Sequence, residues 1–482
     1  MLRRGLCIRA RKKLLQDART LQERVMSSVW TSTSQMLSGD QYNDAHSPPC
    51  ISHSPIRRFR TVSASSSASE EAPKQTTVST ARNESNSIDF PGGRVPFTDR
   101  LCFIGGALSP SQPASCYRTL DSTGACIEDA EVPHDINENL ALRIYDTMVK
   151  LQTMDVIFYE AQRQGRFSFF MTSNGEEATI IGSAAALSDE DHIFSQYREH
   201  GALLYRGFSF LDMAHQCFGN MRGHGKGRQM PIHYGSKVHN FQTVSAPLAT
   251  QLPHAVGAAY ALKLQGQKAV TAVYFGEGAA SEGDFHAALN FAATLSAPVL
   301  FICRNNGWAI STPATEQYKG DGIVGRGPSY GIPSVRVDGG DVRAVYNATA
   351  EARRIALEHT CPVLIEAMSY RSGHHSTSDD SSRYRTAEEM GVWRARDPAT
   401  RFHNFIVGRG WWDADRERQL RVDSRKQVVD ALTEAQKGVK PPLSELFTDV
   451  YADMPWHLRE QAAEAQAHAE RHPDSLHGIP LE

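Results

Sequence analysis

Short apolar runs alternate along the middle of the chain with longer stretches in which apolar residues recur at helical spacing. The predicted strands are 269–275, 298–303, 334–337 and 362–368, and the predicted helices are 248–264, 284–295 and 341–359. Alternation of strands and helices predicts a parallel sheet flanked by helices. The run 298–303 is apolar throughout, which is typical of a strand covered on both faces of such a sheet. We therefore predict an α/β fold.

Both ends of the chain depart from this pattern. The first 16 residues carry six basic side chains and no acid, with leucines between them, as organelle transit peptides do. A disordered basic arm is the alternative interpretation. The serine-rich tract 63–87 lacks the apolar residues that a core needs. The predicted organisation is a transit peptide and disordered segment over 1–87, an N-terminal arm over 88–135, the α/β domain over 136–391 and a helical C-terminal tail over 392–482.

Composition and charge exclude several classes of partner. The chain has 482 residues, 40% of them apolar, and a formal net charge of −3. This near-neutral charge does not predict nucleic acid as a partner, and no apolar run approaches the roughly 18 residues of a membrane span, so no membrane is predicted either. Eight cysteines without C-x-x-C spacing favour a reducing compartment and core packing.

The segment Gly276-Glu277-Gly278 follows a predicted strand and is typical of a turn that binds phosphate. The glycines let the backbone approach a diphosphate, but the Glu277 carboxylate would repel that anion unless a cation lay between them. Asn306 follows the next predicted strand, so Glu277 and Asn306 should lie at the same edge of the sheet. One carboxylate, one amide and a backbone carbonyl suit magnesium, so we predict a magnesium site here.

This turn has two alternative interpretations. A glycine turn without a ligand is one, and a degraded nicotinamide-nucleotide fingerprint is the other. That fingerprint requires an acid about 20 residues further on, whereas Cys303 and Arg304 stand near that position, and it places no carboxylate against the pyrophosphate. Just beyond the turn, Ser281 and Asp284 have the spacing of a capping box and predict the start of the helix 284–295.

Further loops carry candidate anion contacts. Tyr197-Arg198 follows a short apolar run, and arginine can bind phosphate through two parallel hydrogen bonds, with a surface salt bridge as the alternative. His374-His375 follows the strand 362–368 in a serine-rich loop, where imidazole can donate to phosphate or transfer a proton, with a plain solvent loop as the alternative. The basic loop 223–231 is a weaker candidate, because solvation alone explains it.

The order Gly276-Glu277-Gly278, a gap and Asn305-Asn306 resembles the thiamine diphosphate motif, with Glu277 where aspartate is usual. Taken with five other segments, it closely resembles the alpha subunits of branched-chain 2-oxoacid dehydrogenases. Those segments are 196–199, 225–231, 247–251, 304–312 and 373–382. The likeness extends from about Ser87 to the C-terminal region and implies the thiamine diphosphate-binding fold.

This resemblance implies the decarboxylating first component of a complex in the mitochondrial matrix. The expected activity is that of a 3-methyl-2-oxobutanoate dehydrogenase, which passes the acyl group to the lipoyl arm of an acyltransferase component. The resemblance also implies an assembly of two alpha and two beta subunits. Because no second nucleotide-fold domain follows the predicted sheet, we expect a partner chain to complete the active site. A pyruvate dehydrogenase alpha subunit and a non-catalytic regulatory subunit are the alternatives.

The resemblance also implies specific site residues. The magnesium ligands would be Glu277, Asn306 and the carbonyl of Trp308, and the thiamine diphosphate contacts would be Tyr197, Arg198, Gly278, Ala279, Arg304 and His375. The potassium loop would comprise Ser245, Pro247, Thr250 and Gln251. His375 would assist lipoyl acylation, and Ser376 would be the target of a regulatory kinase and phosphatase. The chain departs from the family at Trp308, where tyrosine is usual, and at Ala246, where serine is common.

Overall fold

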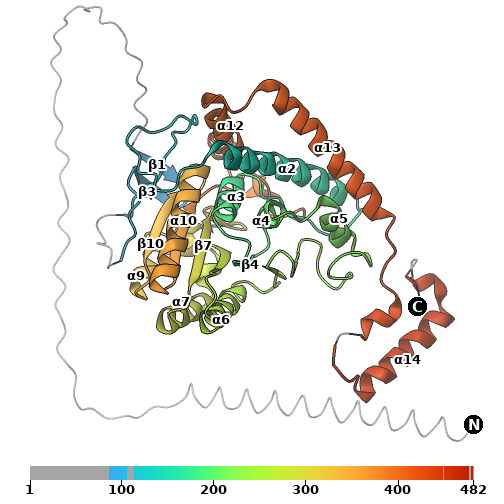
Figure 1. The fold of residues 1–482 in the computed structure, drawn as a ribbon. Helices are drawn as coiled ribbons and strands as arrows, with labels where there is room; N and C mark the ends of the chain where they lie inside the picture. Colours follow the sequence, from blue (N-terminus) through green and yellow to red (C-terminus); the bar gives the residue numbers. More distant parts are fainter. Residues whose placement is uncertain (1–85, 106–112, 449, 477–478, 481–482) are drawn as a thin grey trace, which may run out of the picture. The chain divides into compact units, whose positions relative to one another are not determined.

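A nine-stranded, mostly parallel sheet forms the centre of the computed structural model, which describes residues 86–105, 113–448, 450–476 and 479–480 (Figure 1). In spatial order the strands are β1 (Ser87–Phe90), β2 (Gly93–Thr98), β3 (Cys116–Tyr117), β10 (Ser334–Asp338), β11 (Val363–Met368), β7 (Val299–Asn305), β6 (Thr271–Gly276), β4 (His192–Phe194) and β5 (Phe241–Gln242). Only β1 and β2 pair antiparallel among these neighbours. A separate ribbon joins β8 (Trp308–Ala309) to β9 (Thr312–Pro313).

The predicted fold class is confirmed, since β6, β7, β10 and β11 match the four predicted strands within two residues. The three predicted helices are α6 (Gln251–Leu264), α7 (Gly283–Leu295) and α10 (Val342–His359). The remaining α-helices are α2 (Glu138–Arg163), α3 (Glu177–Ala185), α4 (His200–Tyr205), α5 (Phe210–Phe218), α8 (Ala314–Gln317), α9 (Arg326–Ser329), α11 (Ala387–Arg394), α12 (Pro398–Gly408), α13 (Ala414–Gln436) and α14 (Trp456–Arg471). Short 3-10 turns are η1 (Ala279–Ser281), η2 (Ser381–Arg383), η3 (Leu443–Leu446) and η4 (Pro473–Leu476).

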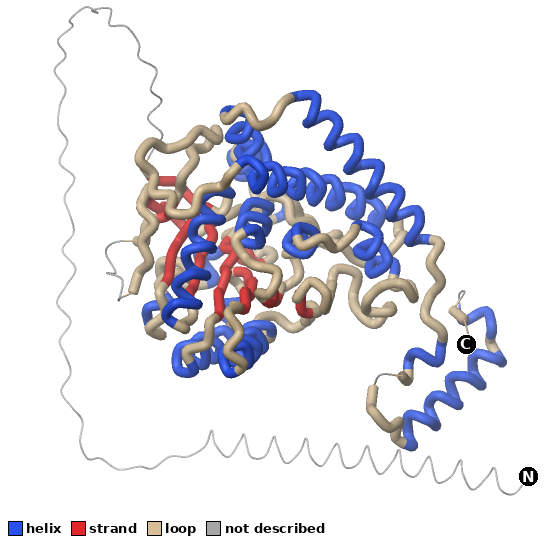
Figure 2. The backbone as a smooth tube through the Cα atoms, viewed as in Figure 1, coloured by secondary structure: helices blue, strands red, loops and turns tan. Residues whose placement is uncertain are grey.

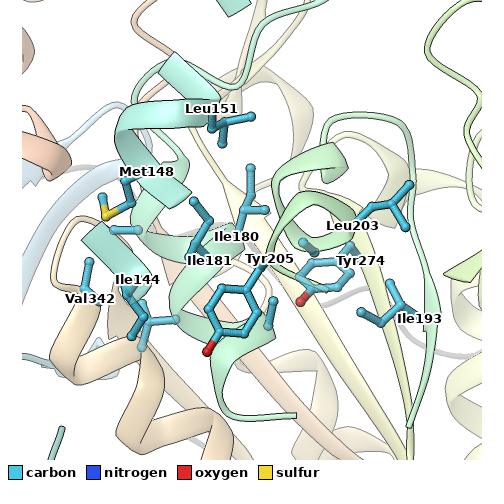
Figure 3. Close-up of a cluster of buried hydrophobic side chains, with 14 of the residues drawn as sticks. Ile144, Met148, Leu151, Ile180, Ile181, Ile193, Leu203, Tyr205, Tyr274 and Val342 are labelled. Carbon is cyan, nitrogen blue, oxygen red and sulfur yellow. The ribbon is translucent and has the colours of Figure 1, made fainter. Parts of the chain in front are cut away.

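The central strands are mostly apolar because each face of the sheet is covered by helices (Figure 2). Alternate residues of β6 point to opposite faces, so Tyr274 belongs to the cluster with α2, α3 and α10, while Phe275 belongs to the cluster with α6 and α7. Figure 3 shows Tyr274 among Ile180 and Ile181 of α3. Its hydroxyl lies 2.8 Å from Ser183 Oγ, so the buried phenol keeps a hydrogen-bond partner.

The C-terminal region is helical, as predicted, but part of it belongs to the main core. Phe402 and Phe405 of α12, with Val428 and Leu432 of α13, are buried in the cluster that also contains α2. Likewise β1, β2 and β3, from the predicted N-terminal arm, extend the central sheet. The transit peptide and serine-rich segment predicted over 1–87 lie outside the described residues, apart from Asn86 and Ser87.

The predicted capping box at the start of α7 is wrong. Glu282 is the N-cap residue and makes no side-chain capping bond, while Ser281 lies in η1 and accepts a hydrogen bond from Gln317 Nε2 (2.7 Å). The short 3-10 turn after the glycines takes up Ser281 before the helix begins. The six cysteines within the described ranges are free thiols. No described helix is both long and apolar enough to cross a membrane.

Candidate cofactor site at the carboxyl edge of the sheet

Four neighbouring strands, β11, β7, β6 and β4, run in parallel, so the loops that follow them meet at one edge of the sheet. These loops surround a cavity of about 310 Å³. The residues predicted for thiamine diphosphate and magnesium all line it: Tyr197, Arg198, Glu277, Gly278, Ala279, Arg304, Asn306, Trp308 and His375. The fold therefore brings together side chains that are almost 180 positions apart in the sequence.

Glu277 lies directly after β6 and is almost completely buried. Its Oε2 accepts a hydrogen bond from the Asn306 backbone nitrogen (3.3 Å), whereas Oε1 has no partner in the part of the chain that the structure describes. Burial raises the pKa of Glu277 to about 7, and the nearby Glu176 carboxylate adds to the shift. A buried carboxylate oxygen without a donor fits a cation ligand, because an unpaired acceptor is costly in a protein interior.

The turn after β7 is held in one conformation. Asn306 Oδ1 accepts a hydrogen bond from Trp308 N (3.1 Å), and the Trp308 indole Nε1 donates to Glu389 Oε1 of α11 (3.0 Å). Gly307 has φ 78°, and a Cβ there would lie 2.2 Å from Pro91 Cβ. Only glycine therefore fits between the two asparagines and Trp308 without displacing the β1–β2 connection.

No group of three or more His, Cys, Asp or Glu side chains that could hold a metal occurs among the described residues. The predicted magnesium set contains only one such side chain, Glu277, and takes its other oxygens from an amide and a backbone carbonyl. At Gly278 a Cβ would approach Ala309 Cβ to 2.6 Å, so the turn leaves no room for a side chain beside the cavity.

Two arginines of the cavity, Arg198 and Arg304, are paired with buried acids that were not among the predicted site residues. Arg304 donates through Nε to Glu199 Oε1 and through Nη1 to Glu176 Oε1 (2.8 Å). Arg198 Nε lies 3.7 Å from Glu176 Oε2. Because these carboxylates balance the charges of Arg198 and Arg304, those two arginines contribute little surplus positive charge for a diphosphate. Arg371 contacts neutral groups instead: His375 Nδ1, the Ile310 carbonyl and the Tyr384 hydroxyl. Glu199 lies in the family-matched segment 196–199, but nothing in the sequence showed that Glu176 pairs with Arg304, 128 positions away.

His375 is held as a neutral ring. Its Nδ1 lies 3.1 Å from Arg371 Nη1 and 3.3 Å from Arg198 Nη2, and because arginine only donates, Nδ1 must be the acceptor. The ring proton is therefore on Nε2. Burial lowers the pKa of His375 to about 3, and the charges of Arg198 and Arg371 contribute to the shift.

The loop that carries His375 is closed by side chains from its own far end. Asp379 Oδ2 accepts hydrogen bonds from the His375 backbone nitrogen (2.8 Å) and from the Tyr384 hydroxyl (2.5 Å). Arg385 Nη2 donates to the Gly373 carbonyl oxygen (2.7 Å). Ser376 is only 8% exposed in this arrangement. A kinase would therefore reach its hydroxyl only after the loop opens.

The residues predicted for potassium form a separate group beside the cavity. Ser245 Oγ lies 2.9 Å from Thr250 Oγ1, which donates to the Pro247 carbonyl oxygen (3.0 Å). The Gln251 side chain does not join this group, because its amide nitrogen donates to the Tyr274 carbonyl oxygen of β6 (3.0 Å). None of the four lines the cavity, but Leu248 of the same turn does.

Some lining residues were missed, and one candidate loop lies elsewhere. Gln196 Oε1 accepts a hydrogen bond from Gly276 N (2.7 Å) and so joins the loop after β4 to the glycine turn. The sequence indicated this role only through the position of Gln196 directly before Tyr197-Arg198. Other unassigned lining residues are Leu248, Glu282, Ala309, Ile310, Gln317 and Arg371. The basic loop 223–231 does not line the cavity, because Lys226 and Arg228 pair with Glu445 instead.

Comparison with known proteins agrees with this architecture. The model of the dehydrogenase E1 component family matches residues 145–444. The chain is 52% identical over 401 residues to 2-oxoisovalerate dehydrogenase subunit alpha 2, mitochondrial, of Arabidopsis thaliana, covering 83% of this chain and 84% of that protein. It is 52% identical over 389 residues to the corresponding alpha subunit of Homo sapiens, with 80% and 87% covered. For that of Dictyostelium discoideum the identity is 54% over 361 residues, with 74% and 82% covered.

Proposed function

The chain belongs to the dehydrogenase E1 component family, and we propose that it is the alpha subunit of a branched-chain 2-oxoacid dehydrogenase whose cofactor half-site is the cavity at the carboxyl edge of the sheet. The enzyme decarboxylates 3-methyl-2-oxobutanoate and related 2-oxo acids and transfers the acyl group to a lipoyl arm. The observation that carries this proposal is the convergence of nine family-matched residues on one cavity. Relatives named for 2-oxoisovalerate favour this substrate class over pyruvate.

The cavity fits the diphosphate end of thiamine diphosphate. Gly278 and Ala279 offer closely approachable backbone, and Tyr197, Arg198, Arg304 and His375 contribute polar groups around it. When bound, thiamine diphosphate supplies a nucleophilic carbon and a cationic ring that stabilises the negative charge left by departing carbon dioxide. The protein's task here is to bind and orient that cofactor and to keep water away from its reactive end.

Magnesium supplies the positive charge that the paired arginines cannot. Glu277 Oε1 lacks a donor, and Asn306 Oδ1 has one lone pair beyond its bond to Trp308 N. Together with the Trp308 carbonyl they would give three oxygen ligands, which is the small protein share that magnesium takes when phosphates fill other positions. Potassium would bind the turn of Ser245, Pro247, Thr250 and Gln251 and fix Leu248 against the cofactor.

His375 would assist acyl transfer as a hydrogen-bond donor. Its two arginine neighbours hold Nδ1 as an acceptor, so the Nε2–H can donate a hydrogen bond to the lipoyl sulfur as that atom gains negative charge, without leaving the ring. Phosphorylation of Ser376 would add about two negative charges next to Asp379 and the cofactor's diphosphate, and repulsion would open the loop. A regulatory kinase and phosphatase would then control activity through loop order.

The chain provides half of an active site, and the family's beta subunit provides the rest. After β11 the described residues form only helices and turns, so they supply no second sheet for the cofactor's ring end. The assembly would contain two alpha and two beta subunits and would deliver acyl groups to the lipoyl-bearing acyltransferase. The relatives are named mitochondrial, which supports a mitochondrial location. Within the mitochondrion we propose the matrix, with the transit peptide within residues 1–87.

Co-expression with a beta chain tests the proposal. The purified complex should decarboxylate 3-methyl-2-oxobutanoate only when thiamine diphosphate and Mg²⁺ are present. A strong preference for pyruvate would make the pyruvate-using alternative correct. Calorimetry that detects no magnesium-dependent cofactor binding in an assembled complex would instead favour a non-catalytic regulatory subunit.

A further inference from the structure

Glu176 is a fully buried acid behind the cavity, at the start of α3. As the N-cap residue it is placed to cap its own helix, yet its side chain makes no capping hydrogen bond. The carboxylate instead lies beside residues at the carboxyl ends of two strands, β4 and β7. The adjacent Glu177 behaves differently, because its Oε2 accepts a hydrogen bond from Gly175 N (2.8 Å) within the same turn.

The contacts of Glu176 converge on the candidate ligands of the cofactor. Its Oε1 accepts hydrogen bonds from Arg304 Nη1 (2.8 Å) and from the Asn306 side-chain Nδ2 (3.2 Å). Its Oε2 lies 3.7 Å from Arg198 Nε and has no hydrogen-bond partner among the described residues. One carboxylate thus joins α3 to the loops after β4 and β7.

The bond to Asn306 decides which way that amide faces. A carboxylate can only accept, so the amide nitrogen of Asn306 must face Glu176 and its oxygen must face the other way. There Oδ1 accepts from Trp308 N (3.1 Å). A reversed amide would place oxygen against the Glu176 carboxylate and nitrogen against the Trp308 N–H, so both contacts would become repulsive. Glu176 therefore leaves the amide oxygen, and not the nitrogen, available for a cation.

We propose that Glu176 is a positioning residue, which fixes the Asn306 amide with its oxygen available to Mg²⁺ and holds Arg304 beside it. The inference rests on the proposed function, because it takes Asn306 Oδ1 as a magnesium ligand. Groups that orient a metal ligand typically change metal affinity by about 10- to 100-fold when removed. Glu176 does not line the cavity, so its substitution should act on the metal through Asn306 and not through direct contact.

Glu176→Gln tests this in the complex assembled with the beta chain. The substitution keeps the size of the side chain but lets it donate as well as accept, so the Asn306 amide is no longer forced into one orientation. Calorimetry with thiamine diphosphate present should show the Kd for Mg²⁺ rising by about 10-fold or more. At saturating Mg²⁺ the KM for 3-methyl-2-oxobutanoate should stay unchanged, which a general loss of structure would not permit.

Glu177→Gln is the matched control, since this neighbouring acid is equally buried and contacts neither Asn306 nor Arg304 in the described structure. It should bind Mg²⁺ with the unmodified Kd. If Glu176→Gln does not assemble, Glu176→Asp retains the charge on a shorter arm and should show a smaller loss of affinity. An unmodified Mg²⁺ Kd in an assembled Glu176 variant overturns the inference alone, whereas no magnesium-dependent binding by the unmodified complex overturns the proposed function with it.

Discussion

Arg198 contacts His375 at two points: its Nη2 donates to the His375 carbonyl oxygen (2.9 Å) and lies 3.3 Å from Nδ1 of the ring. Through Nη1 the same guanidinium donates to the Thr172 carbonyl oxygen (2.7 Å). The arginine therefore fixes both the backbone and the ring of His375 relative to the body of the protein. A residue predicted as a diphosphate contact therefore also determines the tautomer of His375.

His375→Asn should lower kcat by about 10²- to 10³-fold, the usual cost of removing one hydrogen-bond donor that stabilises developing charge, and should also weaken thiamine diphosphate binding, because His375 lines the cofactor cavity. Because burial and two arginines lower the pKa of His375 to about 3, the ring is neutral across the working range. The pH profile of kcat between 5.5 and 8 should therefore have the same shape in both proteins. An acid limb near pH 6 that disappears in the variant would contradict the assignment.

Glu277→Gln should abolish magnesium-dependent cofactor binding. Removing a group that only orients a metal ligand weakens metal affinity by up to about 100-fold. Because Glu277 is proposed as a ligand itself, we expect the Kd for Mg²⁺ to rise by at least that factor. The unliganded complex should not lose stability, because Glu277 Oε1 has no donor among the described residues and the substitution removes a buried charge. Calorimetry and thermal melts of the same preparation measure both quantities. Unchanged affinity would refute the role of Glu277.

Glu177 gives a pH dependence of stability with a definite sign. Burial raises its pKa to about 8, and the charge of Asp397 adds to the shift, so the folded protein keeps a proton that the unfolded chain has lost above about pH 4.5. The contribution of Glu177 to the free energy of unfolding is therefore fully present below about pH 4.5. Between about pH 4.5 and pH 8 it falls by about 1.4 kcal/mol per pH unit. Glu177→Gln should remove this slope. Its melting temperature should exceed that of the unmodified complex at pH 8 and approach it at pH 5.

Ser376→Glu should impair activity through the order of the loop. Ser376 is 8% exposed, and Asp379 and Arg385 hold the loop closed around it, so a buried negative charge there would favour the open form. Limited proteolysis should cut the variant's loop faster, with kcat reduced in parallel. Ser376→Ala, which adds no charge, should resemble the unmodified protein. Equal cleavage rates and equal turnover in all three would rule out this mechanism.

The sequence predicted β6, β7 and β11 because strands covered on both faces carry long apolar runs, such as residues 299–303 of β7. It could not predict β3 and β5, since two-residue strands have no periodicity. The family motif placed Glu277 and Asn306, but not Glu176, whose role depends on hydrogen bonds to residues 128 and 130 positions away. Ser281 was misassigned because a capping box and a 3-10 turn share the same local residue types.

Trp308→Tyr tests whether position 308 acts through its backbone alone. The proposed ligand is the carbonyl oxygen, which the substitution keeps, while the indole Nε1 donates only to Glu389 Oε1 (3.0 Å). The variant should bind Mg²⁺ with nearly the same Kd and lose about 1 kcal/mol of stability, the typical value of one hydrogen bond. Glu389→Gln is the control for that bond, since it keeps an oxygen that can accept from the indole. A tenfold weaker Mg²⁺ affinity in Trp308→Tyr alone would mean that the indole itself shapes the metal site.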